Sequence, residues 1–166
     1  SNVYDFIEDT QRRVWIATMG GGLQYFDLNS GRIHICSDIN LLVNNWIGSI
    51  YYSKINNSLY LGTYEGLWRI GLSDFGNDNE QVLSQSIIYD IHQDADGVIW
   101  AATSEGLVRW EQSNENLGAN DIILLTQGQG LPSNICYSLE SDDLEQIWVS
   151  TGNGLSRINR KSFLIT

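Results

Sequence analysis

The sequence predicts an all-β protein: a β-propeller fragment of four blades, each a four-stranded antiparallel sheet. The first observation is a stretch that occurs four times, in which an aliphatic residue, an aromatic residue, two small or aliphatic residues and a threonine precede a short turn and Gly-Leu. The aromatic residue recurs at positions 15, 60, 100 and 148, and such a period of about 40 to 50 residues is typical of solenoids and propellers. The third observation is that strands such as residues 14–16 and 122–125 are apolar on both faces and need cover on both sides, which neighbouring blades provide.

Each repeat contains the same elements in the same order. It opens with an apolar pair three residues apart, and a polar turn then precedes the strand that carries the aromatic residue. A third strand follows the Gly-Leu, and three repeats continue to a further apolar segment at residues 33–35, 81–83 and 122–125, whereas the fourth ends near residues 163–165. We therefore place the blades at approximately 1–43, 44–84, 85–131 and 132–166.

The turn after the aromatic strand has the pattern Thr-x-x-Gly, which predicts a tight hairpin closed by a glycine in the left-handed region. The threonine hydroxyl is suited to bond the turn backbone. Because the four copies share one phase, we expect equivalent buried positions for the four repeated aromatics: Trp15, Tyr60, Trp100 and Trp148.

Composition and charge exclude several classes of function. The hydrophobic fraction of 42% indicates a globular chain, and no apolar run of about 18 residues indicates a membrane span or membrane contact. A net charge of −11 disfavours nucleic acid as a partner. Cys36 and Cys136 lack zinc-ligand spacing, and we expect two small buried hydrophobes and not a disulfide. Because the chain begins inside a repeat, at Val3, we expect a piece of a longer protein, with Ser1-Asn2 an expression scar.

The repeats resemble the two-component regulator propeller repeat. The third copy carries that family's pattern most fully, as Ile88, Ile91, Asp94 to Gly97, Ile99-Trp100, Thr103 and Gly106-Leu107. Residues 130–134, Gly-Leu-Pro-Ser-Asn, match the family's connector between blades. The second copy departs most, with Tyr60 in place of tryptophan, and only the third keeps the glycine of Asp-x-x-Gly.

The resemblance implies a periplasmic location, in a seven-bladed ring whose other blades come from the rest of the parent chain. The parent would be a sensor histidine kinase of a two-component system, anchored in the inner membrane, and many such sensors respond to oligosaccharides. From the residues themselves we expect no cofactor, no metal and no catalytic residue in this segment, because it contains no credible acid–base pair, phosphate loop, nucleophile or metal-ligand spacing.

Candidate reactive groups have simpler explanations. Residues 20–22 and 152–154 are glycine-rich but lack the lysine and following helix of a phosphate loop. Residues 94–97 begin like a calcium loop, but no later ligand arrives at the required spacing. Two sets of repeated residues could form an anion-binding triad, or a carboxylate pair as in glycosidases. They are Arg69, Arg109 and Arg157, and Glu65 and Glu105. The simpler explanations are that the arginines line the grooves between blades and pair with acidic neighbours, and that the glutamates recur only because the turn is repeated.

We expect a binding face instead. In a propeller the Thr-x-x-Gly turns and the connectors between blades open around the channel mouth. Amides, a carboxylate and exposed aromatics there would suit sugar hydroxyls and sugar faces. The candidate ligand-binding residues are Asn45, Trp46, Tyr64, Glu65 and Asn134.

Two other functions stay open at this point: a sialidase-like propeller glycosidase, and a structural scaffold that binds nothing small. Four blades of a seven-bladed design leave the terminal faces uncovered, so we also expect the fragment to self-associate. We expect four apolar residues on those faces: Val14, Ile16, Ile147 and Val149.

Overall fold

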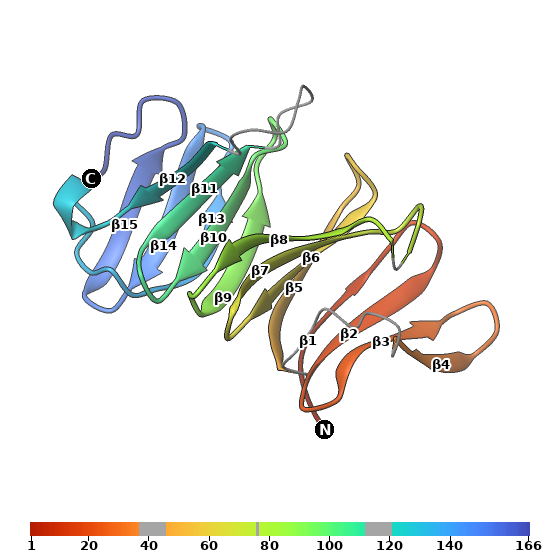
Figure 1. The fold of residues 1–166 in the computed structure, drawn as a ribbon. Coiled ribbons are helices and arrows are strands. Elements are labelled where there is room, and N and C mark those ends of the chain that lie inside the picture. The colour runs from red at the N-terminus through yellow and green to blue at the C-terminus, as the bar shows by residue number, and fades with distance from the viewer. Residues whose placement is uncertain (37–45, 76, 112–120) are drawn as a thin grey trace. The chain divides into compact units, whose positions relative to one another are not determined.

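The structure is a computed structural model that describes residues 1–36, 46–75, 77–111 and 121–166, with the side chain of residue 121 excepted. The described residues form two compact units, Ser1–Ile88 and Tyr89–Thr166. Each unit is built from β-strands (Figure 1).

The first unit holds two four-stranded antiparallel sheets, in which consecutive strands pair in sequence order. The first sheet comprises β1 (Asn2–Glu8), β2 (Arg13–Met19), β3 (Gly22–Asp27) and β4 (Arg32–Ile35). The second comprises β5 (Ile47–Ser53), β6 (Ser58–Thr63), β7 (Gly66–Gly71) and β8 (Asn79–Ser84).

The second unit holds the remaining two sheets. The third sheet comprises β9 (Ile88–Gln93), β10 (Ile99–Thr103), β11 (Leu107–Glu111) and β12 (Asp121–Leu125), and the short 3-10 helix η1 (Gln127–Gln129) follows. The fourth has three strands, β13 (Cys136–Ser141), β14 (Gln146–Thr151) and β15 (Gly154–Asn159), and where a fourth strand would lie the chain makes one bridge, between Ile158 and Ile165. The predicted all-β blade architecture is confirmed, and it differs only in this last strand. The blade boundaries at 43/44, 84/85 and 131/132 stay a prediction.

The repeated aromatic lies at the centre of its sheet in each copy. Trp15, Tyr60 and Trp100 are fully buried, whereas Trp148 is only partly buried. All four occupy the same register, each opposite one residue of the next strand: Tyr25, Arg69, Arg109 and Arg157. The expected equivalence is therefore observed, but the expected burial of Trp148 is wrong, because the face of the last sheet that carries it packs against no further sheet among the described residues.

An aspartate in the first turn of the repeat holds both the turn and the tryptophan. One carboxylate oxygen accepts the indole N–H, and the other accepts two backbone N–H groups of the turn. The indole bonds are Trp15 to Asp9 at 2.8 Å, Trp100 to Asp94 at 2.9 Å and Trp148 to Asp142 at 2.8 Å. In the second sheet, Asn56 donates to the Tyr60 hydroxyl at 2.8 Å instead.

The same turn keeps one backbone conformation even where its glycine is replaced. The residue three before the aromatic has φ of +88° at Gly97 in the third copy. The other three copies place a non-glycine residue there at positive φ: Arg12 (63°), Asn57 (50°) and Glu145 (63°). A side chain costs energy in this region, so glycine in the third copy is the unstrained form of the turn.

The Thr-x-x-Gly hairpins form as predicted. In each, the threonine hydroxyl donates to the carbonyl oxygen of the closing glycine, at 2.8 to 3.0 Å. All four closing glycines have positive φ: Gly22, Gly66, Gly106 and Gly154. The first turn is one residue longer, since it runs from Thr18 to Gly22.

The terminal sheets expose opposite faces. In the first sheet Val14 and Ile16 lie on the exposed face, which also carries Phe6, because Phe6 pairs with Ile16. In the last sheet Ile147 and Val149 are fully buried, so their predicted exposure is wrong. Within each unit, the face of one sheet that carries the repeated aromatic packs on the other face of the next sheet, so the equivalents of Val14 and Ile16 are covered in the last sheet. Exposed apolar residues of the last sheet and its turns include Tyr137, Leu144, Leu155 and Leu164.

Neither Cys36 nor Cys136 forms a disulfide, as expected. Cys136 is fully buried in the core of the second unit, and burial raises the pKa of its thiol to about 11. Cys36 is half-buried against the core of the first unit.

Candidate functional site

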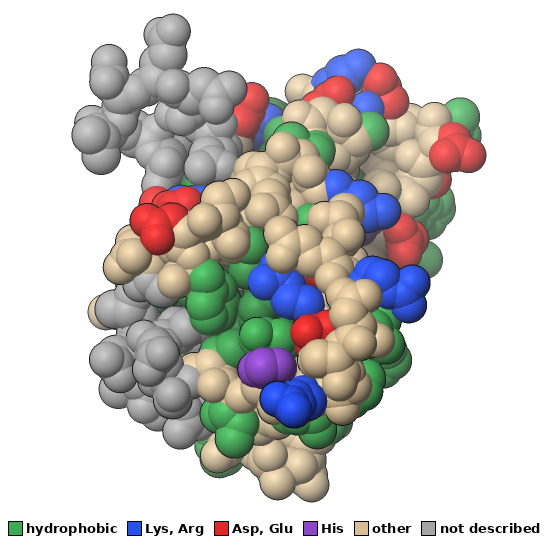
Figure 2. Space-filling model, turned by 90° about the vertical axis from the view of Figure 1, so that its right-hand side faces the viewer, with side chains coloured by type: hydrophobic (Ala, Val, Ile, Leu, Met, Phe, Trp, Pro, Cys, Tyr) green, Lys and Arg blue, Asp and Glu red, His purple; other side chains and the backbone are tan. Residues whose placement is uncertain are grey.

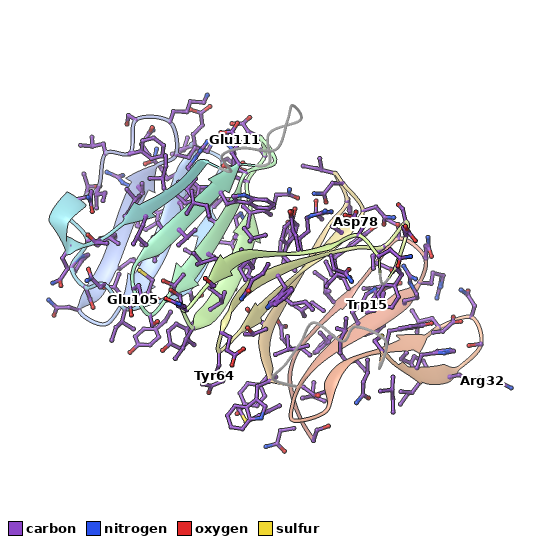
Figure 3. All side chains as sticks on the ribbon, in the orientation of Figure 1. Trp15, Arg32, Tyr64, Asp78, Glu105 and Glu111 are labelled. Atoms are coloured by element: carbon purple, nitrogen blue, oxygen red, sulfur yellow. The ribbon has the colours of Figure 1, made fainter. Side chains whose placement is uncertain are left out.

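Two of the predicted site residues form an exposed aromatic pair in the first unit. The rings of Trp46 and Tyr64 meet edge to face, with centroids 5.2 Å apart. Even so, Trp46 remains 44% exposed and Tyr64 46% exposed. Trp46 is held by a backbone bridge to Met19 at the end of β2, and Tyr64 occupies the turn that joins β6 and β7. Figure 3 shows Tyr64 at the end of the second sheet opposite to Asp78. The pair therefore lies at the Thr-x-x-Gly end of the first unit.

The other predicted residues are placed less uniformly. Glu65 follows Tyr64 in the same turn, where its amide is held by the Thr63 hydroxyl at 3.1 Å. Asn134 belongs to the second unit, and its side-chain oxygen accepts the amide N–H of Gln127 at 2.8 Å. Asn45 lies outside the described residues. The shared position of all five at a channel mouth stays a prediction.

A second exposed aromatic pair, in the second unit, escaped the sequence reasoning. The rings of Tyr89 and Tyr137 lie 5.5 Å apart, and these residues are 37% and 48% exposed. Both directly follow the first apolar residue of the repeat, as does the exposed Tyr4 in the first copy. This recurrence is visible in the sequence and was the signal that could have found the pair.

The repeated arginines have different partners, although they share one position in the repeat. Arg69 donates to Asp78 at 2.6 and 3.1 Å and to Glu80 at 2.9 Å. The Arg69 guanidinium lowers the pKa of Asp78. Arg109 pairs with Glu111 at 2.7 Å, which makes pairing with acidic neighbours the better description of both arginines. Arg157 lies over the Trp148 ring at 5.9 Å.

The aspartates in the first turn of the repeats use their carboxylate oxygens to hold the turn and the tryptophan. Asp94 accepts hydrogen bonds from Trp100 and from two backbone amides, so its oxygens already have partners where a calcium loop would need ligands. Within the described ranges, no cluster of three or more His, Cys, Asp or Glu residues is arranged to hold a metal ion. The arrangement offers exposed aromatic faces and hydrogen-bonding groups, which suit binding.

The comparisons with known proteins agree with this architecture. Residues 82–105 match the family described as "Two component regulator propeller". Among curated proteins, none matches the chain.

Solved structures share the fold. The extracellular domain of a protein assigned as a one component system, BT4673 of B. thetaiotaomicron, superposes with a TM-score of 0.75 at 18% identity, over 94% of this chain and 21% of that one. The extracellular domain assigned to the hybrid two component system BT3049 of B. thetaiotaomicron gives 0.74 at 20% identity, over 95% and 20%. A streptogramin B lyase gives 0.73 at 13% identity, over 100% and 54%.

The chain therefore spans about a fifth of the length of these two extracellular domains. No helix in the described part of the chain is long and apolar enough to cross a membrane. The third copy thus matches the two-component regulator propeller repeat, and the chain shares its fold with the extracellular domains of these two B. thetaiotaomicron proteins.

Proposed function

We propose that the chain is part of the ligand-sensing propeller of a two-component sensor histidine kinase, on the periplasmic side of an inner membrane that anchors the parent protein. The match of residues 82–105 to the regulator propeller family supports the sensory role. The extracellular position of the structurally similar domains supports the location.

The ligand we propose is an oligosaccharide that stacks on Trp46 and Tyr64. The single observation that carries this proposal is that two large aromatic side chains remain nearly half exposed while they contact each other. Aromatic rings with one polar end are suited to surfaces that are apolar on one side and wet on the other, as a sugar ring is. Glu65, with Asn45 and Asn134 if the channel mouth brings them together, would bond the sugar hydroxyls.

Calorimetry with neutral oligosaccharides of glucose, galactose, mannose, xylose and arabinose tests this proposal. We expect at least one to bind, and Trp46→Ala and Tyr64→Ala each to weaken it about tenfold or more, since a stacked aromatic contributes about 1 to 3 kcal/mol. Ile55→Ala is the matched control, because Ile55 is an exposed apolar residue in a turn of the same sheet. Binding that survives both aromatic substitutions would contradict the site.

We propose that this segment binds and does not catalyse. The nearest candidates for an acid–base pair, Glu65 and Glu105, lie one in each unit. Release of reducing sugar from the same panel, abolished by Glu65→Gln or Glu105→Gln, would favour the glycosidase instead.

The uncovered terminal faces are proposed to contact other blades, or a second copy of the fragment when it is alone. In the first unit the Trp15 face of one sheet packs on Ile50 and Leu61 of the next. In the first sheet, Phe6 is the equivalent of Ile50 and Ile16 is the equivalent of Leu61, and neither has such cover. In the last sheet, the face that carries Trp148 also has no such cover among the described residues. The Trp148 face of one copy would pack on the face of another copy that carries Phe6 and Ile16, so association would be head to tail. Light scattering that gives a monomer of 18.7 kDa at all concentrations would contradict this.

A further inference from the structure

We infer that the second unit contains a separate binding site for an organic anion, in a pocket of about 660 Å³ lined by Arg109, Arg160 and Phe163. This volume lies within the range of about 300 to 1,000 Å³ that is usual for small-molecule sites. The pocket adjoins Glu111 at the end of β11, and Figure 3 shows Glu111 and Glu105 at opposite ends of this unit. The inference does not depend on the proposed oligosaccharide site, which lies in the first unit.

The two arginines are largely buried, but their acidic partners are more exposed. The side chains of Arg109 and Arg160 are only 14% and 12% exposed, whereas Glu111, which pairs with Arg109, is 57% exposed, and Asp96 and Glu145, which pair with Arg160, are 59% and 42% exposed. The Arg160 contact to Asp96 is 3.4 Å, long for a charge-assisted hydrogen bond. An anion entering the pocket can therefore replace these exposed carboxylates at small cost, because half-exposed ion pairs contribute little.

The guanidinium groups also have spare hydrogen-bonding capacity. A guanidinium offers five N–H donors. The Nε atoms of Arg109 and Arg160 are buried without a hydrogen-bond partner among the described residues. By contrast, Arg69 occupies the same repeat position as Arg109 but donates to Asp78, Glu80 and Ser58. A ligand oxygen that accepts from the guanidinium N–H groups of Arg109 and Arg160 would give them hydrogen bonds of the kind that Arg69 already makes to its carboxylates.

The rest of the lining suits a ring-sized body and not a bare inorganic ion. Phe163 lies with its ring 5.6 Å from the Arg109 guanidinium carbon, and Ile122, Ile123 and Val98 add apolar surface. Phe163 has φ of +57°, a costly conformation for a bulky residue, and its amide is fixed by the Asn159 carbonyl at 2.9 Å. The remaining inner carboxylate, Asp94, is occupied by three internal hydrogen bonds and does not compete for the arginines. A carboxylated sugar such as a uronic acid combines the required charge and ring face.

Glucuronate and glucose form a matched pair of probes, since they differ only in a carboxylate in place of a hydroxymethyl group. At low ionic strength we expect glucuronate to bind saturably and glucose to bind about tenfold or more weakly. Arg109→Gln and Arg160→Gln should each weaken glucuronate by about tenfold. Arg157→Gln, in the same repeat position as Arg109 but outside this pocket, should leave it unchanged.

Glu111→Gln guards against variants that simply fail to fold. Its side chain is mostly exposed, so the substitution spares the core, and removal of the competing charge should tighten glucuronate about threefold. Equal binding of glucose and glucuronate would overturn the inference. So would full competition by inorganic sulfate, or unchanged binding in folded Arg109→Gln and Arg160→Gln.

Discussion

Asp94→Ala should strongly destabilise the protein, because this turn carboxylate is buried and accepts three internal hydrogen bonds. Asp94 is 5% exposed, and it accepts the indole N–H of the fully buried Trp100 and the amide N–H of Val98 and Asp96. The Trp100 and Val98 donors are buried, and a buried donor left without a partner costs about 1 to 3 kcal/mol. With partial relaxation of the turn we expect a loss of about 3 to 4 kcal/mol in the free energy of unfolding.

Guanidinium denaturation followed by tryptophan fluorescence measures this loss, and the midpoint of thermal unfolding should fall by about 10 °C. Asp96→Ala is the matched control in the same turn: its carboxylate is mostly exposed, so the change should be within about 0.5 kcal/mol. Asp142→Ala should cost less than Asp94→Ala, because water reaches the partly exposed Trp148. If Asp94→Ala and Asp96→Ala differ by less than about 1 kcal/mol, the aspartate is not the support of the buried tryptophan.

Three further predictions concern backbone strain and acid stability. Arg12→Gly should stabilise by about 0.5 to 1 kcal/mol in chemical denaturation, because it removes a side chain at φ of +63°, and a loss of stability would show that Arg12 is not strained. Gly66→Ala should lower the free energy of unfolding by about 3 kcal/mol or more, because the new methyl group overlaps the Leu83 carbonyl. The methyl group of Gly154→Ala meets nothing within 4 Å, so this variant should lose only about 1 to 2 kcal/mol. Equal losses would refute the steric argument. Burial acts to raise the pKa of Asp9, but hydrogen bonds from Trp15 and Arg13 outweigh it and lower the pKa, so the ionised Asp9 stabilises the fold above about pH 4 and this stabilisation is lost as pH falls through the folded-state pKa. Asp9→Asn should therefore make the free energy of unfolding depend less on pH in this acid range. An unchanged pH dependence would contradict this.

The repeat period alone was enough to predict the sheets and the place of their aromatic residues. It also predicted the glycine-closed hairpins, because the Thr-x-x-Gly pattern fixes both a hydrogen bond and a backbone conformation locally. The turn at Arg12 shows the limit of such patterns: the chain keeps the positive φ of Gly97 although the glycine is gone. Conformation there is imposed by Asp9 and the strands on each side.

Properties that depend on which face of a strand is covered could not be predicted from the pattern. Val14 and Ile147 hold equivalent places, yet one is half-buried and the other fully buried, because successive side chains point to opposite faces and only one face of each terminal sheet is packed. The exposure of Trp148 has the same cause.

The candidate sites depend on contacts between segments far apart in the sequence. Trp46 and Tyr64 were both proposed from their turns, but that their rings touch follows only from the folded chain. The pocket beside Arg109 needs Arg160, which arrives from the turn after β15 and carries no repeated signal. Local patterns therefore find the turns, and tertiary packing decides which side chains meet.

The sugar-binding role of Trp46 is tested most directly by the indole N–H signals of the six tryptophans in a ¹H–¹⁵N spectrum. The signal of Trp46 is assigned by its loss in Trp46→Phe, and the oligosaccharide that binds tightest in calorimetry is then titrated. If Trp46 binds the sugar, its signal shifts during the titration and saturates with the same dissociation constant that calorimetry gives. The signals of the buried Trp15 and Trp100 stay in place. A saturating ligand that leaves the Trp46 signal unmoved would contradict this role.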